Sequence, residues 1–375
     1  MGDSMSAELK INPKLLQWAR EECGYSPAEI AIRLHIDQEK YLEWESTGTG
    51  LDLNDLIALS KALKRQIAFF FLPSVPPKTR KPTDFRNLEP ASARLSQKTL
   101  LAIRHTAWFQ DFLLQLQGVD YYRDKYSWIS RFKESFADKL DSNKSVLWLR
   151  NLLSYPIEEQ TAGDINAAAS YKRWRNSVEQ NLGIHVFQFS LPKEEVQGFS
   201  YSDSFPYCIT VNSAYPPTSR TFTLFHELAH ILNSQSGLCR PDATVLRSDD
   251  TAIEHDCNAF AGALLVPDKE VIRARDKDTI YKFASRLKVS SEVYLRRLFA
   301  LDLVSENEFF LLLDEIRRSV LPTRPHYPKS PIARSINSRG EALFNSAIEA
   351  MNQRKVSYSL AADILGLKIN YLSNL

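Results

Sequence analysis

The fold is decided by the stretch Thr221-Phe222-Thr223-Leu224-Phe225-His226-Glu227-Leu228-Ala229-His230-Ile231-Leu232, which contains an HExxH motif. On a helix, His226 and His230 lie on the same face because they stand four residues apart, so both imidazoles can bind one Zn²⁺. Glu227 is rotated by about 100° from His226 and can reach a water on that metal without being a ligand. The motif predicts a zinc-dependent hydrolase with Glu227 as general base. The alternative is an ordinary helix whose two partly buried histidines pair with other side chains.

A third zinc ligand is expected from an apolar helix predicted at residues 254–265. Glu254, Asn258 and Ala261 share one face of this helix by their i, i+4, i+7 spacing. A glutamate on a buried face requires a partner, so we predict Glu254 as the third ligand. Asn258, one turn later, is predicted to hydrogen-bond a ligating histidine. The alternative third ligands are its neighbours His255, Asp256 and Cys257.

Changes in sequence pattern divide the chain into four parts, 1–72, 73–91, 92–320 and 321–375. The first part reads as short helices. The second is predicted to be a linker, because it holds five of the 18 prolines and proline blocks helix formation. The third is mainly helical, although hydrophobicity alternates with period two through 184–212 and predicts a small sheet there. With a short helical last part, the predicted fold class is α+β, mostly helical.

The composition is that of an ordinary globular protein, with 44% hydrophobic and 25% charged residues, which excludes a disordered or coiled-coil chain. Lys and Arg number 47 against 45 Asp and Glu, so the overall charge gives no argument for nucleic acid. The four cysteines form no CxxC pair, which argues against disulfides. No signal peptide is visible, and the longest apolar run, Ile67–Leu72, is too short to cross a membrane. We expect a cytoplasmic protein without membrane contact.

The chain resembles the ImmA/IrrE-type zinc metallopeptidases, in particular members fused behind an Xre-type helix-turn-helix domain. The resemblance runs over most of the chain. The residues that carry it are Gly198-Phe199-Ser200 and the stretches 205–212, 220–230 and 254–267. It implies a zincin-like, gluzincin-like domain over 92–320, with Glu227 as the base and with the zinc ligands His226, His230 and Glu254. It also implies an endopeptidase that cleaves a specific partner protein, a transcriptional repressor, in a stress, phage or mobile-element response. Cys257 stands where relatives often have alanine, a small change that leaves the site plausible.

The strand predicted at Cys208–Asn212 lies shortly before the zinc helix and is a candidate edge strand. An extended peptide could add to it by β-augmentation, with Ile209 and Val211 as substrate contacts. The alternative is ordinary sheet packing. The oxyanion donor is not identified by the sequence, and the candidates by proximity are Tyr201, Tyr207, Tyr215 and Arg220.

Residues 1–72 resemble Xre-type DNA-binding domains, beginning with a capping box at Ser26-Pro27-Ala28-Glu29. The helix expected in the major groove, 37–45, holds four acidic residues and one basic residue, a net charge of −3. Phosphate contacts dominate DNA affinity, so this charge argues against DNA binding. A protein-binding or homodimer-forming role is the other interpretation, and no nucleic-acid-binding residue is assigned.

The positive charge lies at the other end, where residues 317–375 hold 9 Lys and Arg against 3 Asp and Glu. This basic surface is either solvated or a contact for nucleic acid or an acidic partner. Within it, 362–367 repeats the helix-turn pattern of 31–36. The alternative function is therefore a DNA-binding regulator or antitoxin-like protein whose zinc site is structural or sensory.

Overall fold

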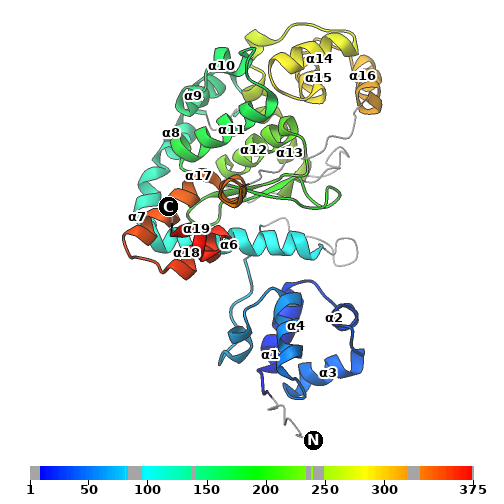
Figure 1. The fold of residues 1–375 in the computed structure, drawn as a ribbon. Coiled ribbons are helices and arrows are strands. Elements are labelled where there is room, and N and C mark those ends of the chain that lie inside the picture. The colour runs from blue at the N-terminus through cyan, green and yellow to red at the C-terminus, as the bar shows by residue number, and fades with distance from the viewer. Residues whose placement is uncertain are drawn as a thin grey trace, which may run out of the picture. The chain divides into compact units, whose positions relative to one another are not determined.

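The computed structural model describes residues 9–80, 82, 95–136, 140–233, 238–239, 249–319 and 330–373, with the backbone alone at 238–239 and 249–251 (Figure 1). The chain forms two compact units, residues 1–81 with 88–105 and residues 82–87 with 106–375. Most of the predicted linker and the boundary predicted near residue 320 lie outside the described residues. The described chain is mostly helical with one small sheet, which confirms the α+β class.

The first unit contains α1 (Pro13–Glu22), α2 (Pro27–Leu34), α3 (Gln38–Thr47), α4 (Leu53–Leu63) and the short helix η1 (Ile67–Phe71). The division between the units falls within α6 (Gln97–Gln117). The second unit continues with α7 (Val119–Lys125), α8 (Ser127–Phe136), α9 (Asn143–Leu153), α10 (Ile157–Thr161), α11 (Ala167–Ser177), η2 (Val178–Leu182), α12 (Pro217–Leu232), α13 (Asp249–Leu265), η3 (Asp268–Glu270), α14 (Lys277–Arg286), α15 (Ser291–Ala300), α16 (Glu306–Ser319), α17 (Pro331–Asn352), α18 (Tyr358–Leu365) and α19 (Ile369–Leu372). Its strands are β1 (His185–Phe189), β2 (Gly198–Tyr201), β3 (Cys208–Asn212) and β4 (Leu238–Cys239).

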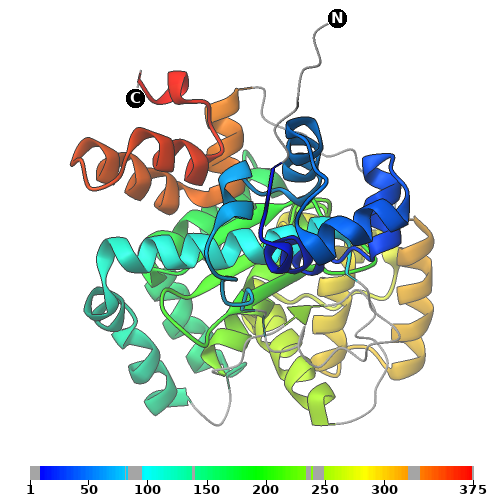
Figure 2. The same ribbon diagram turned by 90° about the horizontal axis from the view of Figure 1, so that it is seen from below.

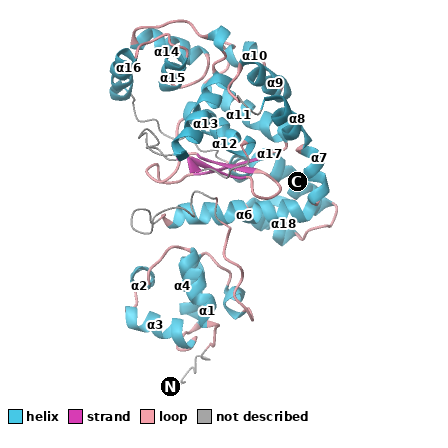
Figure 3. Cartoon of the chain, turned by 180° about the vertical axis from the view of Figure 1, so that it is seen from behind, coloured by secondary structure: helices cyan, strands magenta, loops and turns pink. Residues whose placement is uncertain are grey.

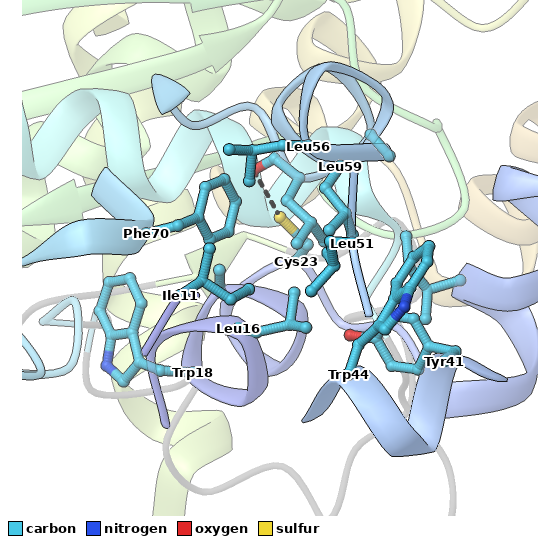
Figure 4. Close-up of a cluster of buried hydrophobic side chains, with 14 of the residues drawn as sticks. Ile11, Leu16, Trp18, Cys23, Tyr41, Trp44, Leu51, Leu56, Leu59 and Phe70 are labelled. Carbon is cyan, nitrogen blue, oxygen red and sulfur yellow. Dashed lines mark hydrogen bonds between the residues drawn. The ribbon is translucent and has the colours of Figure 1, made fainter. Parts of the chain in front are cut away.

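The helices of the first unit pack around a buried apolar cluster that includes Leu16, Tyr41, Trp44 and Leu59 (Figure 4). The predicted capping box starts α2: the Ser26 side chain accepts from the Glu29 N–H, and the Glu29 carboxylate accepts from the Ser26 N–H. These two bonds satisfy backbone donors that the first helical turn leaves without partners.

The strand order in the sheet is β1-β3-β2-β4. Strand β3 pairs in parallel with β1, so that Val186 lies opposite Ile209, and antiparallel with β2, so that Gly198 lies opposite Val211. The prediction that Cys208–Asn212 is an edge strand is therefore wrong, because β3 has a neighbour on each side. Ile209 and Val211 are fully buried, so the structure does not offer them to a peptide as predicted.

Helices cover both faces of the sheet (Figure 3). Helix α12 packs against β2 and β3 on one face, with α11 and α13 beside it. On the other face, the second half of α6 contributes Thr106, whose hydroxyl lies 2.8 Å from that of Thr210, and Phe109, which packs on Phe187. Among the described residues, none of the helices is both long and apolar enough to span a membrane.

Helix α17 runs along the outer edge of β1 and is broken at Gly340. The side-chain amide of Gln188 donates to the Asn337 carbonyl over 2.7 Å on the α12 side of the sheet. On the α6 side, the Arg339 guanidinium lies 5.6 Å from the centre of the Phe109 ring. Helix α17 therefore contacts β1 through Gln188 and α6 through Phe109. Figure 2 shows the C-terminal helices of this unit in orange and red.

The break in α17 is stabilised by the buried carboxylate of Glu179. This carboxylate accepts from the N–H groups of Glu341 and Ala342, at 3.1 and 3.4 Å, and so caps the second half of the helix. Its partner Arg175 lies 3.7 Å away and is also buried. Gly340 has φ +84°, and a Cβ there would lie 1.9 Å from Glu179 Oε1, so the approach requires glycine.

Candidate metal centre

Helix α12 carries the HExxH motif, and every residue from 223 to 232 is buried. Its apolar side chains account for this position. For example, Phe225 packs edge-on against Trp174 of α11 with ring centroids 4.9 Å apart. Because these apolar side chains bury the helix, its polar residues His226, Glu227 and His230 also lie in the interior.

The structure brings His226, His230 and Glu254 together across α12 and α13. The two Nε2 atoms lie 3.1 Å apart. Each of them lies 3.2 Å from a Glu254 oxygen, His226 from Oε2 and His230 from Oε1. Among the described residues, these three form the group whose ligand atoms all lie within 4.8 Å of one another.

These distances fit a tetrahedral metal. Zinc bonds of about 2.0–2.1 Å separate neighbouring ligand atoms by about 3.3–3.4 Å in a tetrahedron. The observed separations of 3.1 to 3.2 Å are close to that value. Two nitrogens and a carboxylate oxygen are also donors that zinc accepts.

Asn258 determines which nitrogen of His226 faces the centre. Its side-chain oxygen lies 3.0 Å from His226 Nδ1, so Nδ1–H donates and Nε2 carries the lone pair. That lone pair faces a second acceptor, the Glu254 carboxylate, at 3.2 Å. Two acceptors at this distance need a cation or a proton between them, which supports a metal at the centre.

Glu254 is the ionised member of the group. Burial raises the pKa of its carboxyl, but the two imidazole rings of His226 and His230 beside it outweigh burial and lower that pKa to about 2. The carboxylate is therefore charged at neutral pH, which is the form that binds a metal.

The alternative third ligands lie outside this group. His255 and Asp256 have side chains 79% and 71% exposed and face each other at 3.7 Å. Cys257 is fully buried, with its sulfur 3.9 Å from the Asn233 side-chain nitrogen. Burial raises the pKa of the Cys257 thiol, which disfavours the thiolate that a metal requires.

Strand β2 approaches Glu227 at Gly198. A Cβ on Gly198 would lie 2.5 Å from the Thr223 methyl group and 3.5 Å from Glu227 Cγ. Glu227 itself is fully buried. The absence of a side chain at Gly198 thus lets β2 pack directly on the HExxH helix, a contact that the sequence analysis missed although the glycine is visible in the sequence.

The candidates for an oxyanion donor are engaged elsewhere or buried. The Tyr215 hydroxyl donates to the Lys193 carbonyl over 2.8 Å. Arg220 donates to the Gln188 side chain over 2.7 Å and covers the ring of a tyrosine in α11. Tyr207 stacks on Tyr126 with centroids 4.4 Å apart, and Tyr201 is buried in β2. We therefore assign no oxyanion donor.

Residues 179–299 match the model of the peptidase family M78, described as the IrrE N-terminal-like domain. The match includes β1 to β3, α12 and α13, and hence every residue of the metal-binding group. It supports the peptidase part of the predicted resemblance, whereas the helices of the first unit lie outside it. No curated protein and no solved structure matched the chain.

Proposed function

We propose that this protein is a zinc-dependent endopeptidase. The observation that carries the proposal is the convergence of His226, His230 and Glu254 beside the buried Glu227, within a segment that matches a peptidase family. The three convergent residues hold the metal, and Asn258 orients the first of them. Bound zinc supplies a lowered pKa for water and a polarised substrate carbonyl.

In the proposed reaction, Glu227 is the residue that moves the proton. Its carboxylate accepts a proton from the attacking water and delivers it to the amine nitrogen as the peptide bond breaks. Helices and sheet surround Glu227 and exclude bulk water, which strengthens its electrostatic interaction with the reacting groups.

We further propose that the substrate is a specific partner protein, a transcriptional repressor, cleaved in a stress, phage or mobile-element response. Support for this finer statement comes from the resemblance to ImmA/IrrE-type peptidases fused to an Xre-type domain. In the first unit, α2 and α3 are joined by a short turn at His35, whose φ is +58°, as expected for a helix-turn-helix.

The experiment compares cells that express the wild type with cells that express Glu227→Gln, which preserves the size of the side chain and removes the base. New protein N-termini are mapped across the proteome. We expect one or a few proteins to be shortened by the wild type alone. If the variant regulates its targets as well as the wild type does, the zinc site is structural or sensory, and the protein acts as a DNA-binding regulator or antitoxin-like protein.

A further inference from the structure

Within the described residues, three turns between α-helices share both their backbone and the spacing to the next helix. Each is centred on a residue in the left-handed region, with φ of +58°, +57° and +60° for His35, Lys288 and Gly366. The residue after each donates its N–H to the carbonyl of an alanine five positions earlier, at 3.1, 3.0 and 2.9 Å for Ile36–Ala31, Val289–Ala284 and Leu367–Ala362. The turn at Arg354 between α17 and α18 makes the same bond, from Lys355 to Ala350 over 2.9 Å, but its next helix begins four residues after the centre. The next helix begins three residues after the centre in α2–α3, α14–α15 and α18–α19, and these three pairs are the helix-turn-helix units compared below.

Of these helix-turn-helix units, α2–α3 and α18–α19 agree most closely. Ser26 and Ser357 each cap an eight-residue helix, and the next helix begins twelve residues after the serine in both. The second helix of every unit also buries the residue at the same place, five positions after the apolar residue of the turn: Tyr41, Tyr294 and Leu372. The units differ in what the second helix leaves exposed.

In α14–α15 the second helix is enclosed. Leu295 is fully buried, and Arg297 is 7% exposed, with its guanidinium bound to Asp268 and to the Val266 carbonyl. Helix α15 packs against both α13 and α16. It has no free face that could enter a groove of nucleic acid.

In α2–α3 the second helix is exposed but acidic. Glu45 is held by Arg20 at 2.8 Å, so its charge is neutralised within the unit. The acidic side chains that remain exposed on and before α3 are Asp37, Glu39 and Glu43, against one basic side chain, Lys40. This face repels phosphate.

In α18–α19 the second helix is exposed and carries no acidic residue. Lys368 and Asn370 are exposed, and residues 364–373 contain no Asp or Glu. Two further basic side chains, Arg354 and Lys355, are exposed in the turn before α18. The exposed acidic side chains of the same stretch are Asp363 on α18 and Glu349 in the last turn of α17, so the three basic groups outnumber them by one.

We propose that the α18–α19 unit contacts duplex DNA, with Lys355 and Lys368 as phosphate-binding residues. Helix α19 is a single turn without charge, and the basic residues are its N-cap Lys368 and the two residues in the turn before α18. Of the three units, this one alone combines, within the described residues, an exposed second helix with an excess of basic groups, which suits contact with the phosphates beside a duplex groove. Because α17 packs against β1, DNA bound here would lie on the same compact unit as the metal centre.

The test measures binding of the full-length chain to a fluorescein-labelled duplex of mixed sequence by anisotropy, over a series of salt concentrations. Lys355→Glu and Lys368→Glu should each weaken binding at least about tenfold and reduce the salt slope by about one. The matched control is Lys40→Glu, an exposed lysine on the second helix of the first unit, which should leave binding unchanged. Thermal melting of each variant verifies that it is folded.

Three results would overturn the proposal: no duplex binding at low salt, unchanged binding by both C-terminal variants, or loss of binding by Lys40→Glu alone. Tyr358 and Ile369, which are 52% and 53% exposed, provide the apolar contacts that a second copy of the chain would use instead. If Ile369→Ser lowers the mass of the particle in solution while Lys368→Glu leaves DNA binding intact, the face is an interface between copies and the DNA proposal fails.

Discussion

The side-chain oxygen of Asn258 lies 3.0 Å from Nδ1 of His226 and so holds the other ring nitrogen toward the metal centre. Replacing Asn258 with alanine should lower zinc affinity by about 10- to 100-fold, because the imidazole loses its preferred tautomer and orientation. Competition with a chromophoric chelator measures this affinity. Asn352→Ala, at an exposed position near the end of α17, is the control and should bind zinc as the wild type does.

Purified protein reconstituted with zinc should retain about one ion per chain. Glu254→Ala and His230→Ala should lose it, because each removes one of the three convergent ligands. His255→Ala should keep the ion, because that side chain is exposed and outside the group. Elemental analysis after gel filtration decides the matter, and loss of zinc from His255→Ala with retention by Glu254→Ala would contradict the assigned ligand set.

Glu227→Gln should retain zinc and melt close to the wild-type temperature, yet lose peptidase activity by about 10²- to 10⁴-fold. The amide preserves the shape of the buried side chain but cannot accept the proton. Once a cleaved protein is known, single-turnover kinetics on it supply the rate, and zinc content and melting are measured on the same sample. An unchanged rate would mean that Glu227 is not the base.

Gly340→Ala should destabilise the protein by more than Gly118→Ala. Both glycines have nearly the same backbone, with φ of +84° and +83°, so alanine costs about 1–3 kcal/mol of strain at either position. A Cβ at Gly118 would meet nothing within 4 Å, whereas one at Gly340 would collide with the Glu179 carboxylate. Urea unfolding measures how much unfolding free energy each variant loses. Equal losses would show that the Glu179 carboxylate can move aside without cost, and hence that its cap on α17 is dispensable.

His185 should make the protein less stable at acidic pH. Burial lowers the pKa of this imidazole from 6.5 to about 4, with a smaller contribution from Lys125. In the unfolded chain this imidazole binds a proton as the pH falls through 6.5, whereas in the folded chain it binds one only near pH 4. The contribution of neutral His185 to the free energy of unfolding is therefore fully present above pH 6.5 and is lost as the pH falls toward 4. The loss amounts to about 3 kcal/mol. His185→Gln should remove this part of the pH dependence, as measured by urea unfolding at several pH values, and the exposed His255→Gln should not.

The grouping of His226, His230 and Glu254 could be predicted because its pattern is local. Four-residue spacing places His226 beside His230, and a buried-face glutamate is conspicuous in a helix of small residues. The strand order could not be predicted in this way, since it depends on pairing between segments far apart in the chain. As a result, β3 was mistaken for an edge, and the contact of Gly198 with the HExxH helix was missed.

Charge counting also had a physical limit. The sequence counts Glu45 with the exposed charges of α3, whereas the structure pairs it with Arg20, a partner 25 residues away. The middle helix-turn-helix was missed for a different reason. Its turn is centred on Lys288, and no resemblance to a known domain pointed to it, as the resemblance to Xre-type domains did for the turn at His35.

The position of α17 along the outer edge of β1 has a consequence for how the chain can be shortened. An uncovered edge strand offers its unpaired backbone groups to other chains and promotes aggregation. Removing everything after residue 319 would strip α17 from β1 and also leave the buried Arg175 and Glu179 open to water. Such a truncated protein should keep the metal ligands but self-associate through β1. The C-terminal helices therefore protect the sheet edge from aggregation, in addition to forming a candidate binding surface.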